Sequence, residues 1–288
     1  MRLYHATMTY KVFKMYHELF PHRKINILES FADLRKINKF MNRRSDMNSI
    51  ILDSGTYTIN NSSIGSDLTI RDYINYLRYN GHLYDFYFNF DDDFTVEGVE
   101  HNCINLAQME ESGLNPVPVI RDIYIELDEI LDQGYPYIAL ASPHIATVDD
   151  LGFAMEKVKK TKTRVHLLGE LDFDFLTLFP INSVDASSWT KTGAYGDILF
   201  YNPEGITDRI YLQEYMRDTK GGRATYCDYE YQDELDRYLK ETFCIEYSDL
   251  LNPNKGVLYK QLINLDYFVK YEEMINRIHM EKGFATDQ

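Results

Sequence analysis

The sequence predicts an α/β protein whose parallel strands alternate with helices and close into a (β/α)8 barrel, followed by a mainly helical C-terminal part. Short runs rich in β-branched and aromatic residues alternate seven times with amphipathic stretches, which is the pattern of consecutive βαβ units. No Gly-x-Gly-x-x-Gly follows the first strand, which disfavours the dinucleotide-binding form of an open, doubly wound sheet. The 288 residues, 44% of them hydrophobic, suffice for one large core of this kind.

The seven expected strands are short apolar runs, most of which end at a small or acidic residue. In chain order they cover residues 25–31, 49–53, 84–90, 116–120, 137–142, 164–168 and 181–185. For the eighth strand the sequence offers residues 197–201 or residues 242–246, without choosing between them. Functional residues of a barrel come from the carboxyl ends of its strands, so a site is expected there.

The stretches between the strands predict helices, because their apolar residues recur at the helical period. They cover residues 33–42, 69–80, 95–112, 123–132 and 147–160. Gly113 is expected to end the third of these helices. Thr147 is expected to begin the fifth, which has Asp149 and Asp150 in its first turn.

The alternation of strands and helices stops after about residue 200, and the rest of the chain predicts mainly helices. The clearest of them cover residues 232–242 and 259–280. We therefore expect a single catalytic domain over residues 1–288. Its barrel core would lie at about 25–200 and its helical part at about 203–288.

The N-terminal segment is basic although the net charge of the whole chain is negative. The net charge is −15, yet residues 1–50 hold ten Lys and Arg against four Asp and Glu, so this segment is +6 and the remainder is −21. A basic face on an acidic body can bind a polyanion locally. The candidate nucleic-acid-binding residues are Lys36, Lys39, Arg43 and Arg44. A merely solvated helix surface is an equally good interpretation.

The composition favours a cytoplasmic protein. No apolar run approaches the ~20 residues of a membrane helix, and the first residues lack the apolar core of a signal peptide. Three scattered cysteines, Cys103, Cys227 and Cys244, are typical of reduced thiols. We expect no membrane partner and a cytoplasmic location, which is the host cytoplasm if a phage encodes the protein.

Two of the expected strands end in an aspartate that small residues follow. Asp53 precedes Ser54 and Gly55, and Asp185 precedes a run of small residues that ends at Trp189, the single tryptophan. Carboxylates on two separate strand ends suit a double displacement at a sugar carbon. One attacks the anomeric carbon and the other moves protons. The alternative is that each caps a turn or a helix, which is the commoner role of an isolated Asp.

Five motifs, in order, resemble those of the tRNA-guanine transglycosylases. They are Asp53-Ser54-Gly55-Thr56-Tyr57, Phe90-Asp91, the run from Gly134 to Ser142, His166-Leu167-Leu168-Gly169 and Val184-Asp185. Together they extend over about residues 25–200, roughly two thirds of the chain. The Ser-Val-Asp-x-Ser-Ser-Trp version that ends at Trp189 is similar to the compact, phage-type branch, which is associated with inserting 7-deazaguanines into DNA. The fold of this family is a (β/α)8 barrel.

The resemblance implies a role for each matched residue. Asp185 would be the nucleophile and Asp53 the general acid/base, while Asp91 would bind the N1–H and the exocyclic amine of a guanine-like base. The backbone around Ala141 and Ser142 would meet the carbonyl side of that base. The other residues expected to contact the substrate or to exclude water are Ser54, Gly55, Tyr57, Phe90, His166, Gly169 and Trp189.

The activity implied by the resemblance is the exchange of guanine in DNA for a free 7-deazaguanine base, such as preQ0 or preQ1, through a covalent Asp-glycosyl intermediate. Three alternatives stay open: tRNA as the polymer, a non-catalytic base-binding partner subunit of the same fold, and a retaining glycosidase or nucleosidase. Retention of both Asp53 and Asp185 argues against the binding subunit. Assembly as a homodimer or with a partner subunit also stays open.

The sequence departs from this family in three places. The zinc site of the family needs a Cys-x-Cys-x2-Cys cluster, whereas Cys227 and Cys244 stand alone, so we expect no metal and no other cofactor. The Gln that many members place after the fourth strand is missing, and Val119-Ile120-Arg121 stands there. Ala141-Ser142 replaces two glycines, so the identity of the substituent at position 7 of the base does not transfer.

Overall fold

The structure is a computed structural model that describes residues 1–33, 40–61, 68–95, 98–141, 145, 147–212 and 224–284. The chain divides into two compact units. The first consists of Met1–Thr7, Ile25–Ala186 and Ile275–Gln288, and the second of Met8–Lys24 and Ser187–Met274.

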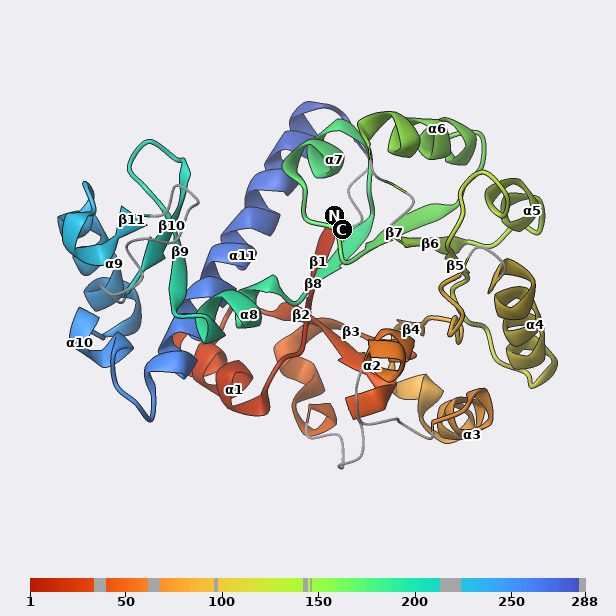
Figure 1. Ribbon diagram of the computed structural model, residues 1–288, viewed down its shortest axis with the longest axis horizontal. Helices are drawn as coiled ribbons and strands as arrows, with labels where there is room; N and C mark the ends of the chain where they lie inside the picture. Colours follow the sequence, from red (N-terminus) through yellow and green to blue (C-terminus); the bar gives the residue numbers. More distant parts are fainter. Residues whose placement is uncertain are drawn as a thin grey trace. The chain divides into compact units, whose positions relative to one another are not determined.

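The first unit is built on a curved sheet of eight parallel strands (Figure 1). The strands are β1 (Arg2–Ala6), β2 (Ile25–Ser30), β3 (Met47–Asp53), β4 (Phe86–Tyr87), β5 (Val119–Ile120), β6 (Tyr137–Ala141), β7 (Arg164–Leu168) and β8 (Ser183–Ala186). Their order in the sheet is β4-β3-β2-β1-β8-β7-β6-β5, and every pair is parallel. The predicted parallel α/β architecture is therefore confirmed.

The two edge segments of this sheet also meet. Phe88, just after β4, forms a parallel bridge with Val117, just before β5. The Asn89 amide donates to the Val117 carbonyl at 3.1 Å, and the Val117 amide donates to the Tyr87 carbonyl at 2.8 Å. The side-chain oxygen of buried Asn89 adds a third link, because it accepts from the Val119 amide at 2.7 Å.

Helices follow most strands of this unit, and α3 to α7 lie along the outside of the curved sheet (Figure 1). The helices are α2 (Thr56–Asn61), α3 (Ile70–Asn80), α4 (Gly98–Glu111), α5 (Leu127–Asp132), α6 (Val148–Val158) and α7 (Phe173–Leu178). Thr69 and Asp72 form a capping box that begins α3, and Thr147 and Asp150 form another that begins α6. Both predicted helix starts are confirmed.

The helix predicted at residues 33–42 falls mostly outside the described residues, and its described ends belong to short 3₁₀ segments. Short 3₁₀ helices cover Phe31–Asp33 and Met41–Asp46, and a third covers Gly81–Leu83. Residues 34–39 lie outside the described part of the chain.

The core of the first unit lies inside the curve of the sheet. Buried side chains from several strands form one cluster there, among them Tyr4, Leu28, Ile51, Phe88 and Ala139. Burying such apolar surface stabilises the fold by roughly 25 cal/mol per Å². Because the strands are covered on both faces, their sequences are nearly continuous apolar runs, which explains why most of them could be recognised.

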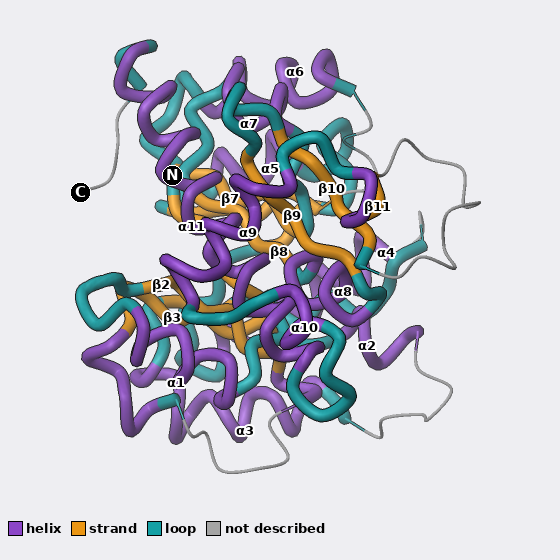
Figure 2. Tube along the Cα trace, turned by 90° about the vertical axis from the view of Figure 1, so that its left-hand side faces the viewer, coloured by secondary structure: helices purple, strands orange, loops and turns teal. Residues whose placement is uncertain are grey.

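The second unit combines a small sheet with helices. Strands β9 (Asp197–Tyr201) and β10 (Thr207–Tyr211) are antiparallel neighbours (Figure 2), and β11 (Ala224–Thr225) pairs with β10 in parallel. The helices are α1 (Tyr10–Leu19), α8 (Ser188–Ala194), α9 (Gln232–Phe243), α10 (Tyr247–Leu250) and the part of α11 (Gly256–Glu281) up to Met274. Residues 203–288 are thus mainly helical in their described part, with two strands added.

Both candidates for the eighth strand of the large sheet are wrong. Residues 197–201 form β9 of the small sheet, and residues 242–246 contain the end of α9 and the left-handed Cys244. The eighth strand is β1, at the start of the chain, between β2 and β8. Its five residues include Arg2 and His5, so the segment has no clear apolar pattern, and its strand conformation depends on pairing with two distant strands.

Candidate active site

Three aspartates lie at the carboxyl ends of strands of the large sheet. Asp53 is the last residue of β3, Asp91 follows β4, and Asp185 lies in β8. The carboxyl ends of parallel strands meet at one edge of a curved sheet. The negative charges of Asp91 and Asp185 both raise the pKa of Asp53, so the three carboxyl groups are close enough to interact.

Asp53 can exchange a proton near neutral pH. Burial raises the pKa of its carboxyl group to about 7, and the charges of Asp91 and Asp185 act in the same direction. The Gly55 amide donates to Asp53 Oδ2 at 2.9 Å and opposes this shift. A carboxyl group with a pKa near 7 can both give and take a proton, as a general acid/base must.

Asp91 is buried and is held by an arginine that sequence analysis did not assign to the site. Arg121 Nη2 donates to Asp91 Oδ2, while the hydroxyl groups of Ser54 and Thr56 each donate to Oδ1 at 3.3 Å. Burial raises the pKa of Asp91, and the Arg121 guanidinium lowers it. Arg121 directly follows β5, so its place at a strand end was the signal that could have identified it.

Asp185 has one oxygen held and one oxygen free. Oδ1 accepts from the Gly169 amide at 2.8 Å and lies 3.3 Å from His166 Nε2. Oδ2 accepts no hydrogen bond from the described residues, and 13% of the side chain is exposed. A carboxylate of this kind, oriented through one oxygen and free at the other, can act as a nucleophile.

The turn after β3 brings Asp53 and Asp91 together and requires a glycine. Gly55 has φ of +80°, and a Cβ built there would lie 2.6 Å from Ala32 Cβ and 2.7 Å from Ser30 Oγ. The predicted Ser54 and Gly55 thus belong to the site. Each has a hydrogen bond to one of the aspartates, Ser54 to Asp91 and Gly55 to Asp53.

Aromatic side chains border this group on one side. The Arg121 guanidinium stacks on Phe94, 3.8 Å from the ring centroid, and Phe94 stacks in turn on Tyr57. Tyr57 is 68% exposed and can therefore contact a ligand. Phe90, predicted to border the substrate, is instead buried and packs against Tyr73 in the core.

The remaining predicted residues lie in four different places. Gly169 and His166 contact Asp185, and Ala141 is a buried residue at the end of β6. Ser142 lies outside the described residues. Trp189 belongs to the second unit and is fully buried, and its carbonyl accepts from Asn264 Nδ2 at 3.4 Å.

The predicted basic segment is only partly described. Lys36 and Lys39 lie outside the described residues. Arg43 pairs with Asp46 at 2.5 Å, and Arg44 pairs with both oxygens of Asp85 at 2.8 and 2.9 Å. These carboxylates offset the charges that the two arginines would offer to a phosphate.

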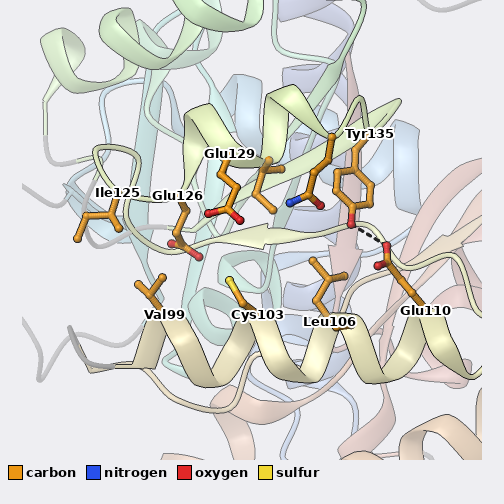
Figure 3. Close-up of a pocket in the computed structure, with 11 residues that line it drawn as sticks. Val99, Cys103, Leu106, Glu110, Ile125, Glu126, Glu129 and Tyr135 are labelled. Atoms are coloured by element: carbon orange, nitrogen blue, oxygen red, sulfur yellow. Dashed lines mark hydrogen bonds between the residues drawn. The ribbon is translucent and has the colours of Figure 1, made fainter.

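A cavity of about 230 Å³ lies between α4 and α5 (Figure 3), on the helical side of the unit. Cys103 and Leu106 of α4 face Glu126 and Glu129 across it. Glu126 already accepts the amides of Arg121 at 2.7 Å and Asp122 at 2.6 Å. The Glu126 carboxylate therefore holds the backbone of the segment that contains Arg121.

The described residues contain no group of three or more His, Cys, Asp or Glu that could hold a metal ion. No helix in the described ranges is long and apolar enough to cross a membrane. The chain matches no protein-family model, no curated protein sequence and no solved structure.

Proposed function

We propose that the protein is a guanine transglycosylase that acts on DNA and replaces guanine with a 7-deazaguanine base such as preQ0 or preQ1. One observation carries the proposal: Asp53, Asp91 and Asp185 end three strands of one parallel sheet in three different states. Asp53 titrates near pH 7, Asp91 is paired with Arg121, and Asp185 Oδ2 accepts no hydrogen bond from the described residues. These states match the three tasks of base exchange at a sugar carbon.

In the proposed reaction, Asp185 Oδ2 attacks C1′ of the nucleotide and the bond from C1′ to N9 of guanine breaks. Asp53 gives its proton to the departing base, so the sugar is left on Asp185 as an ester. The incoming base then gives its N9 proton to the Asp53 carboxylate and attacks C1′. The ester bond breaks, and Asp185 and Asp53 return to their starting states.

Asp91 and Arg121 would recognise the base. Asp91 Oδ1 accepts two long hydrogen bonds from the hydroxyl groups of described residues, and a ligand N–H can replace them. Arg121 bonds Asp91 Oδ2 and supplies an N–H donor beside it. It stands where the sequence lacks the glutamine that many tRNA-guanine transglycosylases have. An acceptor next to a donor is complementary to the N1–H and the carbonyl of a guanine-type base.

The bridge between Phe88 and Val117 supports a closed (β/α)8 barrel, since it joins the two edges of the eight-stranded sheet. DNA is proposed as the polymer because the segment from Ser183 to Trp189 resembles the phage-type branch. We further propose that the enzyme acts in the cytoplasm, or in the host cytoplasm if a phage encodes it.

The experiment is to incubate the protein with labelled guanine and, separately, with duplex DNA, single-stranded DNA and tRNA. Label in DNA supports the proposal, whereas label in tRNA alone assigns the polymer to RNA. The Asp185→Asn variant is the matched control, because it keeps the shape of the side chain and removes the nucleophile. Normal incorporation by this variant would exclude a covalent intermediate, and no incorporation into any polymer, with guanine, preQ0 or preQ1, would overturn the proposed exchange.

A retaining glycosidase or nucleosidase is the second candidate, because an acid with a pKa of about 7 beside a free carboxylate is also the pair that such enzymes use. The same incubation separates the two activities. Water as the acceptor would release free guanine without incorporating label.

A further inference from the structure

A chain of polar side chains runs through the interior of the first unit and ends at Asp185. Tyr137 OH lies 2.6 Å from Ser183 Oγ, which lies 2.6 Å from His166 Nδ1. The other ring nitrogen, Nε2, lies 3.3 Å from Asp185 Oδ1. His166 is 0% exposed and the other two are buried, so water does not replace these hydrogen bonds.

The Asp185 carboxylate determines which group donates in each hydrogen bond of this series. An ionised Asp185 can only accept, so His166 Nε2 must carry a hydrogen. The ring of His166 lies among the rings of Tyr4, Phe86 and Phe88. In the neutral ring Nδ1 is then an acceptor.

The donors follow from this assignment. Ser183 must donate its hydroxyl hydrogen to His166 Nδ1, which leaves Ser183 Oγ as an acceptor for the Tyr137 hydroxyl. Tyr137 thus donates to Ser183, Ser183 donates to His166, and His166 donates to Asp185. The neutral Nε2–H tautomer of His166 satisfies all three contacts.

We propose that Tyr137, Ser183 and His166 are positioning residues for Asp185, the nucleophile of the proposed function on which this inference rests. Asp185 selects the Nε2–H tautomer of His166, and Ser183, with Tyr137 behind it, holds the ring through Nδ1. That N–H and the Gly169 amide hold Oδ1, so the carboxylate cannot rotate and Oδ2 stays directed at the substrate. The same two donors stabilise the negative charge that returns to Asp185 when its ester bond breaks.

The tautomer can be measured without any substrate, by ¹⁵N NMR of the histidine ring at pH 7.5. We expect a protonated Nε2 and an unprotonated Nδ1 in the wild-type protein, and a shifted Nδ1 resonance in Ser183→Ala, because Nδ1 loses its hydrogen-bond donor there. Ser49→Ala is the matched control. Ser49 is buried like Ser183 and lies 2.8 Å from the hydroxyl group of Tyr4, and its other hydrogen bond is to Asp85. A protonated Nδ1 in the wild type, or an unchanged Nδ1 resonance in Ser183→Ala, would overturn the proposal.

The second measurement is the rate at which the covalent protein–DNA adduct forms. His166→Leu should form it about 10- to 100-fold more slowly, the effect of losing a hydrogen bond to a charged group, while KM changes little. Ser183→Ala should slow it less, because the lost bond is to His166 rather than to the carboxylate. His166→Gln should recover part of the rate, because its amide can donate to Asp185, and Ser49→Ala should react as the wild type does. Equal rates in Ser183→Ala and the wild type would also overturn the proposal.

The two measurements separate this inference from the proposed function. If the wild type forms no adduct while its tautomer is the expected one and the Nδ1 resonance responds to Ser183→Ala, the transglycosylase proposal fails and the hydrogen-bonded chain stands. If the adduct forms and the tautomer is the wrong one, the proposed function stands and the positioning chain fails.

Discussion

The raised pKa of Asp53 suits acid/base chemistry and lowers the stability of the folded protein at neutral pH. Its carboxyl group is buried beside two other acids, and its pKa is raised to about 7. The folded protein therefore holds a proton on Asp53 at pH values where the unfolded chain, with an ordinary pKa of 3.8, has lost it. The group that this proposal uses as an acid/base is destabilising at neutral pH.

This leads to a prediction about Asp53→Asn. Because the folded pKa is higher than the unfolded one, the unfolding free energy of the wild type should fall as pH rises from about 4 to about 7, then level off. The Asn variant has no carboxyl group to ionise at this position. At pH 8 its unfolding free energy should therefore exceed that of the wild type by up to about 4 kcal/mol. Urea unfolding at several pH values measures the difference between the two proteins, and a difference that does not vary with pH would refute the shifted pKa.

A second prediction at this scale concerns Arg121. Its charge lowers the pKa of Asp91, so in Arg121→Met that pKa should rise and Asp91 should accept hydrogen bonds from a base less well as pH falls. Binding of free guanine should weaken more at pH 6 than at pH 8.5, as measured by calorimetry. Ser54→Ala is the control, since it removes a neutral contact to Asp91 and should change binding equally at both pH values.

At the scale of the element, the turn that joins β3 to α2 positions both Asp53 and Asp91. Its backbone passes so close to Ala32 and Ser30 that only glycine fits at position 55. The Gly55 amide also donates to Asp53, so the conformation of this turn and the pKa of the acid depend on each other.

Gly55→Ala should therefore lower the unfolding free energy by about 2–4 kcal/mol, from left-handed backbone strain together with the clash against Ala32. Gly134→Ala is the matched control, because Gly134 has φ of +76° and nothing within 4 Å of the added Cβ, so about 1 kcal/mol of strain is expected there. Thermal or urea unfolding compares the two variants. Equal losses would show that the close approach to Ala32 is unimportant.

The elements that could be predicted from sequence are those whose signal is local. Strands β2 to β8 follow apolar runs, and Asp53 and Asp185 stand out because they end such runs. β1 could not be predicted because its conformation comes from pairing with β2 and β8. The same reason applies to Arg121, whose ion pair with Asp91 forms only when the ends of β4 and β5 come together.

Trp189 shows a different case. A large aromatic residue after two serines looks like part of a substrate site, and the structure buries it fully. Asp185 and Trp189 belong to different units, because the boundary falls between Ala186 and Ser187.

At the scale of the whole molecule, the uneven charge decides how a polyanion could bind. If the basic N-terminal segment carries DNA, the logarithm of the affinity should fall with the logarithm of the salt concentration, by about 0.9 for each phosphate neutralised. Replacing Lys36, Lys39, Arg43 and Arg44 with Glu should weaken DNA binding and flatten this slope, while binding of the free base stays nearly unchanged.

The ion pairs refine that prediction. Arg43→Gln with Arg44→Gln should change the slope by less than the ~1.8 expected for two free charges, since Asp46 and Asp85 already offset them. The variant with Lys36→Gln and Lys39→Gln is the comparison. Filter binding across a salt series measures the slopes, and a quadruple variant with the wild-type affinity and slope would assign DNA binding to another surface.

The junction of Phe88 and Val117 has a consequence for how the molecule opens. β4 and β5 have two residues each and are linked by one bridge, whereas β2 and β3 pair over six positions. Local separation should therefore begin at this junction, and the amides of Asn89 and Val117 should exchange with deuterium sooner than those of Ile27 and Ile51. Asp91 and Arg121 follow these two strands, so each such opening would also part the ion pair, and a bound base that bridges them should slow the exchange.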